Sequence, residues 1–282
     1  MDDTDVPDTN PFNVVLLATD GSEFSAGVER VGIEMAAKHH SRLFILRLLL
    51  STPGTDAFIV EEQEAALSLE RVVAQCAAHG VSCLPMVRPT DEPSHGILSA
   101  AEEVGAQLVI LGRRGKRGLA KFMVGDATAK VLDKAGCSVL VVPRLFSFWN
   151  SGVLLVVEPT TAEGDVAASA AFNVAKIAQL PLTILAVSED DEEECRESNQ
   201  VVNRLVAMAK LQKISAEGLV QPGDKVDVIL EVARQRSTDI IVSEPYDRSV
   251  IDRLFNVNKL VRAIGKAHCP VLVARPSPAV AS

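Results

Sequence analysis

The chain has 282 residues, of which 48% are hydrophobic and 23% are charged, and its formal net charge is −9. This is enough apolar mass for two globular domains, while the acidic balance argues against nucleic acid as a partner. No apolar run approaches the length of about 18 residues that a membrane span needs, and the acidic N-terminus lacks the features of a signal peptide. Five cysteines without C-x-x-C spacing indicate reduced thiols and a cytoplasmic protein.

Short apolar runs alternate with helical patterns along the first half of the chain. Ser22 is the predicted N-cap of the first helix, and Gly80 is predicted to end the second. The predicted strands of this half are 14–18, 43–50, 81–87, 107–111 and 138–142, and its predicted helices are 23–39, 57–78, 93–104 and 125–135.

The same order starts again after an aromatic-rich linker at Pro143–Ser151, which we expect to pack against the fold. Alternating strands and helices predict parallel, doubly wound sheets with helices on both faces. The predicted strands of the second half are 153–158, 182–187, 214–220, 239–243 and 270–274, and its predicted helices are 163–179, 190–213, 223–236 and 251–267.

The two halves end on similar sequences, which indicates a tandem repeat. Cys137-Ser138-Val139-Leu140-Val141 aligns with Cys269-Pro270-Val271-Leu272-Val273, at an offset of 132 residues. A period of this length predicts two whole domains, at residues 11–145 and 151–276. Two similar, covalently linked folds are expected to pack as a pseudo-dimer about an approximate two-fold axis.

A glycine-rich segment follows the fourth predicted strand: Gly112-Arg113-Arg114-Gly115-Lys116-Arg117-Gly118, and then Gly125 before a helix. In an open parallel sheet, ligands bind beyond the carboxyl ends of the strands, where this loop lies. Glycines allow backbone N–H groups to approach phosphate oxygens, and the helix N-terminus adds a positive dipole end. Lys116 and Arg117 either add charge to such a site or form a solvated basic loop, and the glycines are otherwise turn residues.

The spacing Gly112-x-x-Gly115, nine residues, then Gly125 resembles the G-2x-G-9x-G-(S/T) signature of the universal stress protein family, and the opening VVLLATDGSE is similar to that family's first strand. The resemblance implies two five-stranded parallel sheets of the adenine-nucleotide α-hydrolase-like fold, with paired final strands. It also implies an adenine nucleotide (ATP, ADP or AMP) in the crevice of the first domain. The implied nucleotide-binding residues are Thr19 and Asp20 at the base and sugar, Leu111, Gly112, Arg114 and Gly115 along the phosphate loop, and Gly125, Asp126, Ala127 and Thr128 at the phosphates.

Asp126 departs from the signature, which has a hydroxyl residue at this position. An ionised carboxylate cannot donate to phosphate and repels it at contact distance, whereas Thr128 still offers a hydroxyl. Three outcomes are open: weakened triphosphate binding, a bridging Mg²⁺ at Asp126, or a ligand with fewer phosphates. Without a ligand, Asp126 would serve as the N-cap of the following helix, and Asp20 would belong to a helix-entry turn.

The second half has lost the glycines of this loop. At the same offset, Gly112 becomes Glu244, Gly115 becomes Asp247 and Gly125 becomes Val257. Asn258 stands in the place of Asp126, and Glu158 in the place of Asp20. We therefore expect the second domain not to hold phosphate.

No set of nucleophile, base and orienting residue can be assembled from the sequence, and neither a G-x-x-x-x-G-K-[ST] loop nor a G-x-S-x-G elbow occurs. The histidines lack metal-ligand spacing, and the acidic run 189–194 predicts a solvated helix start or, alternatively, a docking patch or cation site. The primary hypothesis is a non-enzymatic stress-response module that binds an adenine nucleotide in its first domain and pairs with a protein partner or a second copy. The alternatives are a slow Mg²⁺-dependent ATPase and a scaffold that binds partners without nucleotide.

Overall fold

The computed structural model describes residues 10–113, 124–144, 146, 150–158, 164–188, 192–245 and 253–276, the side chains of 164–165 and 253–259 excepted. In the first half, the strands are β1 (Val14–Thr19), β2 (Arg42–Leu49), β3 (Cys83–Pro89), β4 (Leu108–Gly112) and β5 (Ser138–Val142). Its helices are the 3₁₀ turn η1 (Glu23–Ser25), α1 (Ala26–His39), α2 (Asp56–Ala78), α3 (Pro93–Val104) and α4 (Asp126–Lys134).

The second half repeats this alternation, as the sequence predicted. Its strands are β6 (Val153–Val157), β7 (Leu182–Ser188), β8 (Ala216–Pro222), β9 (Ile240–Ser243) and β10 (Val271–Val273). Its helices are α5 (Gly164–Ala178), α6 (Glu192–Leu211), α7 (Lys225–Gln235) and α8 (Arg253–Lys266). No described helix combines the length and apolar character that crossing a membrane requires.

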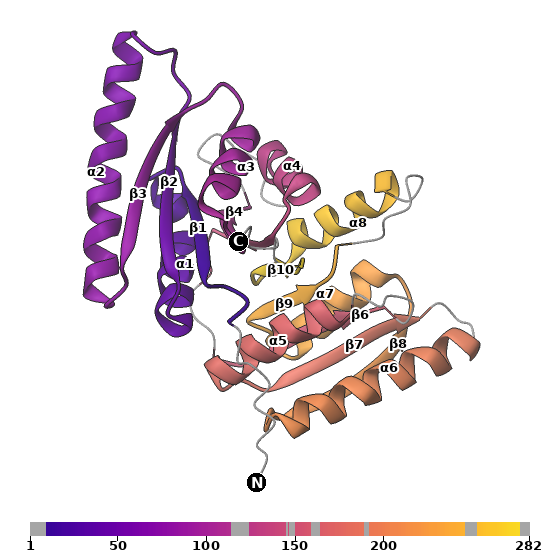
Figure 1. Cartoon of the computed structure of the whole chain (residues 1–282). Coiled ribbons are helices and arrows are strands. Elements are labelled where there is room, and N and C mark those ends of the chain that lie inside the picture. The colour runs from indigo at the N-terminus through magenta and orange to yellow at the C-terminus, as the bar shows by residue number, and fades with distance from the viewer. Residues whose placement is uncertain are drawn as a thin grey trace.

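All ten strands form one sheet in the order β3-β2-β1-β4-β5-β10-β9-β6-β7-β8 (Figure 1). Each half contributes five parallel strands in the same relative order, which confirms the predicted tandem doubly wound fold. The single antiparallel pairing among the described strands joins β5 to β10. The halves therefore meet through their final strands, as in a dimer built within one chain.

The register of this pairing gives the offset, in residues, between the two copies of the repeat. Val139 faces Val273, Leu140 faces Leu272 and Val141 faces Val271. Leu140 and Leu272 are 132 residues apart, which is the offset that the sequence predicted. The approximate two-fold axis thus passes between these two leucines.

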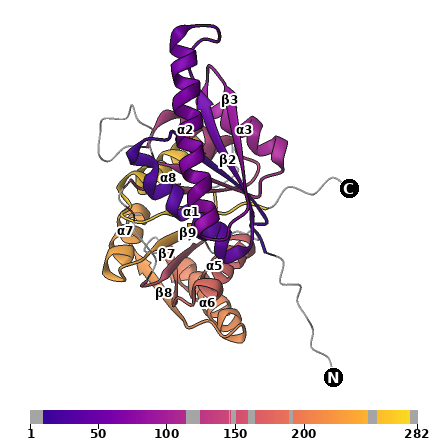
Figure 2. The ribbon, with the colours of Figure 1, turned by 90° about the vertical axis from the view of Figure 1, so that its left-hand side faces the viewer.

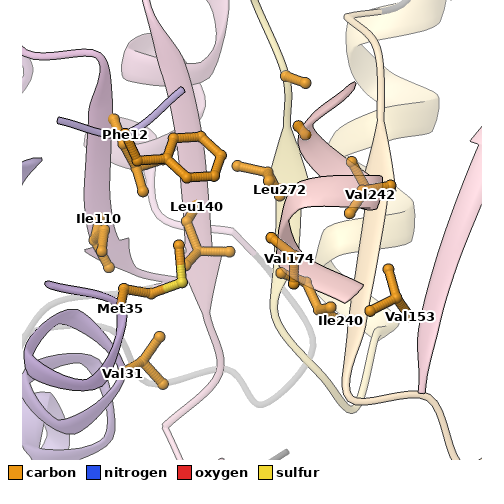
Figure 3. Close-up of a cluster of buried hydrophobic side chains, with 14 of the residues drawn as sticks. Phe12, Val31, Met35, Ile110, Leu140, Val153, Val174, Ile240, Val242 and Leu272 are labelled. Atoms are coloured by element: carbon orange, nitrogen blue, oxygen red, sulfur yellow. The ribbon is translucent and has the colours of Figure 1, made fainter. Parts of the chain in front are cut away.

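Helices cover both faces of the sheet, and each face has its own apolar core. One core joins β-strand side chains to α1, α2, α5 and α6, and the other joins them to α3, α4, α7 and α8. The first core continues across the join between the halves, where Leu140 lies beside Leu272 (Figure 3). Figure 2 shows α2 along the outside of the first half and α6 along the outside of the second. Aliphatic residues dominate both cores, which fits strands buried on both faces.

Several local predictions are confirmed, one of them only in part. Gly80 has a φ of +68° just after α2, as a helix-terminating glycine should. All five cysteines are free, and Cys76, Cys137 and Cys269 are buried. Ser22 is the N-cap residue of the 3₁₀ turn η1, which leads into α1, but its side chain makes no capping bond, and its hydroxyl donates to Asp20.

A buried carboxylate holds the segment by which the chain enters the second half. Asp239, directly before β9, accepts backbone N–H bonds from three consecutive residues through Oδ2: Asn150 at 3.0 Å, Ser151 at 2.5 Å and Gly152 at 2.9 Å. Gln107 holds the corresponding place before β4 and accepts the Val14 N–H at 3.2 Å. A side-chain acceptor therefore fixes the start of the first strand in each half.

Candidate functional site

The candidate site lies at the carboxyl ends of β1 and β4. These strands are neighbours in the sheet, with Ala18 opposite Leu111, although β2 and β3 separate them along the chain. The chain turns outward from β1 to β2 on one side and continues from β4 to β5 on the other. This is the switch point at which open parallel sheets bind ligands. Thr19, Asp20, Leu111 and Gly112 are brought together here, as predicted.

Asp20 is held in a tight turn directly after β1. Its Oδ1 accepts three bonds, from the Ser22 amide at 3.0 Å and from the hydroxyls of Ser22 and Ser25, each at 2.6 Å. Gly21 adopts a φ of +68°, and a Cβ at this residue would lie 2.7 Å from Cβ of Ser68 on α2. The turn therefore requires glycine, and the carboxylate has a defined orientation at the crevice.

Thr19 faces away from solvent and supports this turn. Its hydroxyl donates to Oε1 of Glu29 at 2.7 Å and accepts the Gly21 N–H at 3.0 Å. Glu29 is only 1% exposed and is held in two places by Arg71 of α2, at 3.1 Å to Oε1 and 2.8 Å to Oε2. The Thr19 side chain is thus committed to a buried ionic network beneath the Asp20 turn.

A groove of about 630 Å³ opens beside Asp20, between the ends of β1 and β2 and the first turns of α2. Partial burial raises the pKa of Glu61, but hydrogen bonds from Ser51 and from the Leu50 amide outweigh it and hold that pKa below its ordinary value. The groove is lined by Asp20, Arg47, Leu50, Asp56, Ala57, Val60, Glu61 and Glu64. Its four carboxyl side chains and single guanidinium make it an acidic wall rather than a phosphate cradle.

The glycine loop is closed at its base by two hydrogen bonds. The Gly125 amide donates to the carbonyl of Arg113 at 2.9 Å, and the Thr128 hydroxyl donates to the carbonyl of Gly112 at 3.0 Å. Thr128 is only 5% exposed. These bonds bring the end of β4 against the N-terminus of α4, so Gly112 and Gly125 lie at the same end of the sheet as Asp20.

Asp126 is the first residue of α4, and Gly125 is its N-cap, so the prediction that Asp126 caps this helix is wrong. The Asp126 side chain is 84% exposed and lies 3.2 Å from the Lys130 ammonium, which also contacts Glu92 at 2.9 Å. Hydrogen bonds to Glu92 and Asp126 raise the pKa of Lys130 above its ordinary value. The Asp126 charge is therefore partly offset, and it lies in the first helical turn, where the dipole favours an acid.

The remaining predicted residues are placed as follows. Leu111 is buried within β4, and Ala127 is partly buried in the first turn of α4. Arg114 and Gly115, together with Lys116 and Arg117, lie outside the described residues. Among the residues that the structure does describe, no three His, Cys, Asp or Glu side chains are grouped closely enough to hold a metal ion.

The corresponding place in the second half is built differently. Val153 pairs with Ile240 as Val15 pairs with Leu108, so Glu158 stands where Asp20 stands in the first half. Glu158 forms an ion pair with Lys225, the first residue of α7. β9 ends at Ser243 and is followed by Glu244 and Pro245. The carboxylate residue Glu244 therefore stands in the second half where Gly112 stands at the end of β4 in the first.

The helix at this place also differs between the halves. At the offset of 132 residues, the start of α4 at Asp126 corresponds to residue 258, but α8 begins five residues earlier, at Arg253. The helix N-terminus that would face a phosphate therefore does not lie at the equivalent position. The predicted replacements Asp247, Val257 and Asn258 have no described side chains.

Sequence reasoning missed residues whose partners are remote in the chain. Glu29 and Arg71 were not singled out, although a glutamate among the apolar residues of α1 is a signal for a buried ionic partner. Ser22 and Ser25 were not recognised as ligands of Asp20. Lys225 and Arg113 carry no local signal, because the structure alone brings them to Glu158 and to α8.

The comparisons with known proteins agree with this geometry. Residues 11–143 match the model of the universal stress protein family. The chain is 31% identical over 147 residues to the universal stress protein YxiE of Bacillus subtilis, covering 46% of this chain and 99% of that protein. It is 32% identical over 151 residues to the universal stress protein Sll1388 of Synechocystis, covering 46% and 97%.

Two solved structures are similar across nearly the whole chain. A universal stress protein from Archaeoglobus fulgidus superposes with a TM-score of 0.73 at 19% identity, covering 94% of this chain and 97% of that one. A putative universal stress protein from Pseudomonas aeruginosa gives a TM-score of 0.75 at 16% identity, covering 95% of each chain. Both likenesses establish the fold over both halves.

Proposed function

Because the chain belongs to the universal stress protein family, we propose that it is a non-enzymatic stress-response module that binds an adenine nucleotide in its first half. The proposed site is the crevice between the Asp20 turn and the loop that leads from β4 to α4. In it, the Asp20 carboxylate accepts hydrogen bonds from the base or sugar. The backbone around Gly112 and Gly125 and the N-terminus of α4 receive the phosphates.

The closed base of the glycine loop is the observation that carries this proposal. The bonds from Gly125 to Arg113 and from Thr128 to Gly112 set the helix N-terminus beside the end of β4. A site built in this way needs little rearrangement to accept an anion, and preorganisation of this kind favours binding. Thr128 is proposed to contribute its backbone N–H in the first turn of α4, because its hydroxyl proton is already donated to Gly112.

The second half is proposed to bind no nucleotide. The Glu158 carboxylate is already paired with Lys225, and α8 starts before the place where a phosphate-binding N-terminus would lie. Glu244 adds a further acidic residue after β9. Like charge and the missing helix end both disfavour a phosphate group there.

The two domains are proposed to be residues 11–145 and 151–276, joined at the β5–β10 pairing. The chain is proposed to act in the cytoplasm through a protein partner. A further pairing of two copies would use an edge of the sheet other than β5 and β10, which are already paired with one another.

Calorimetry with ATP, ADP and AMP, each with and without Mg²⁺, tests the proposal, together with native mass spectrometry of the purified chain. We expect one nucleotide per chain. No bound nucleotide and no heat at millimolar ligand would leave the scaffold alternative. Phosphate release measured in the same samples addresses the ATPase alternative, which requires turnover that Asp126→Ala abolishes.

The pseudo-symmetry of the chain supplies matched variants for this experiment. Asp20→Asn keeps an oxygen for Ser22 and Ser25 but removes the charge, and it should weaken nucleotide binding about tenfold. Glu158→Gln, at the equivalent position of the second half, should leave the affinity unchanged. Asp126→Ser should increase ATP affinity if repulsion limits it, whereas Asp133→Ser on the same helix is the control for a general loss of negative charge.

A further inference from the structure

Arg113 joins the glycine loop of the first half to the last helix of the second half. It directly follows β4, and its Nη1 group donates toward three carbonyl oxygens at the end of α8. The distances are 3.1 Å to Ile264, 2.8 Å to Gly265 and 2.9 Å to Ala267. The partly buried guanidinium of Arg113 thus connects the first half of the chain to α8 of the second half.

These carbonyls need a donor, because the last carbonyl groups of a helix have no partner within it. They also carry the negative end of the helix dipole, which favours a cation. Arginine satisfies both requirements, and hydrogen bonds from a charged donor are stronger than neutral ones. The Arg113 side chain is therefore the C-terminal cap of α8, although it comes from the other half of the chain.

The backbone of the same residue closes the glycine loop. The Arg113 amide donates to the carbonyl of Val142 at 3.0 Å, and its carbonyl accepts the Gly125 amide at 2.9 Å. The start of α4, where the phosphates are proposed to bind, is thus one hydrogen bond away from the residue that caps α8. One residue connects the proposed site to the second half through two sets of bonds.

A second arginine makes the reverse connection from a different position. Arg275, which follows β10, donates through Nη2 to the carbonyl of Leu132 in the last turn of α4, and its amide donates to the Ser138 hydroxyl at 3.1 Å. At the offset of 132 residues, Arg275 corresponds to Pro143 and Arg113 to Pro245. The helix that follows the glycine loop and its counterpart α8 are therefore each capped by an arginine of the opposite half.

We propose that the second half of the chain positions the nucleotide loop of the first half through Arg113, which couples ligand binding to the C-terminal end of α8. The inference rests on the proposed nucleotide binding. It gives the second half a function that does not require a ligand of its own. Because coupling is reciprocal, a nucleotide bound in the first half should also stabilise the last turn of α8.

The test compares Arg113→Ala with Arg262→Ala in the full chain. Arg262 lies on α8 itself, its side chain is half-exposed, and its guanidinium lies 3.6 Å from the exposed carboxylate of Asp227. With ADP as the probe, Arg113→Ala should weaken binding about tenfold, the size expected for losing charged hydrogen bonds. Arg262→Ala should bind like the wild type, and Arg113→Lys should recover part of the loss because it keeps the charge.

Hydrogen exchange supplies the readout that a general loss of stability would not move. In the wild type and in Arg262→Ala, ADP should slow exchange at residues 263–267, and this protection should disappear in Arg113→Ala. Equal ADP affinity in Arg113→Ala and the wild type, or no ADP protection of residues 263–267 in a wild type that binds ADP, would overturn the coupling.

The same experiment separates the failure of the coupling from the failure of the proposed function. If the wild type binds no nucleotide, the proposed function fails, and the positioning role of Arg113 is tested on the protein without nucleotide. Faster exchange at residues 125–128 in Arg113→Ala than in Arg262→Ala would then support positioning by Arg113. Unchanged exchange there would overturn it.

Discussion

Leu140 of β5 lies directly opposite Leu272 of β10, and each is the counterpart of the other in the repeat. Both side chains are fully buried, at 0% exposure, in the core that the two halves share. An antiparallel pair whose two members are repeat-equivalent can occur only on the approximate two-fold axis. The stability of the join should therefore depend on these two leucines in nearly equal measure.

We expect Leu140→Ala and Leu272→Ala each to lower the free energy of unfolding by about 2–5 kcal/mol, as buried Leu→Ala substitutions do. Because the residues are in contact across the strands, the double variant should show a coupling energy of about 0.5–3 kcal/mol. Denaturant unfolding measures all three variants. Leu17→Ala with Ile184→Ala, on the distant strands β1 and β7, is the control pair and should be additive; strict additivity of the leucine pair would contradict the shared core.

Thr19→Val should destabilise the fold by about 1–3 kcal/mol, because it removes the donor to the buried Glu29 and the acceptor of the Gly21 amide. Thr19→Ser keeps the hydroxyl and should retain most of the stability. Thermal or denaturant unfolding in the absence of nucleotide measures the effect. A Thr19→Val protein as stable as the wild type would assign the hydroxyl to ligand contact rather than to the turn.

The stability of the protein should fall between pH 6.5 and pH 4 because of His39. Burial, followed by the charges of Lys38 and His40, lowers the pKa of this histidine from 6.5 to about 4. In this window the unfolded chain binds a proton that the folded chain does not, so acidification favours unfolding, by up to about 1.4 kcal/mol per pH unit. Above pH 6.5 the imidazole is neutral in both states, and this contribution to the pH dependence vanishes.

The variant His39→Leu should flatten that part of the pH profile, measured as the denaturant midpoint at each pH. In the wild type, the His39 ring packs edge-on against Phe12, with 5.5 Å between the ring centroids, so an apolar replacement suits the site. His268→Gln, at an exposed position, is the matched control and should keep the wild-type slope. An unchanged slope in His39→Leu would show that other groups cause the loss.

Asp239→Ala should cost about 2–3 kcal/mol, because three consecutive amides at the entry to β6 lose their acceptor. Asp239→Asn retains one acceptor oxygen and should lie between this variant and the wild type. Asp133→Ala, at an exposed position of α4, should be neutral. Equal stability of Asp239→Ala and Asp133→Ala in urea would exclude the role assigned to this carboxylate.

The sequence predicted the fold well, because strands buried on both faces and helices between them leave strong local patterns. The repeat followed from two similar strand endings, and the register of Leu140 and Leu272 confirms the offset. The Asp20 turn and the glycine loop were also placed at one edge, since the carboxyl ends of parallel strands meet there.

What sequence reasoning could not supply are the bonds between residues far apart in the chain. Arg113 stands in the glycine loop, yet its guanidinium donates to backbone carbonyls about 150 residues later in the chain. Lys225 pairs with Glu158 although four elements, α5, β7, α6 and β8, lie between them along the chain. Such partners depend on the finished sheet and are not encoded in the neighbouring residues.

The pairing of β5 with β10 has a consequence for how the protein behaves on dilution. Two separate chains that met through these strands would part as their concentration fell, and any site that depended on the contact would weaken with them. Here the linker keeps the two strands at a fixed, high local concentration. The cap that Arg113 provides should therefore persist at any protein level in the cell, and the two halves are always present in a one-to-one ratio.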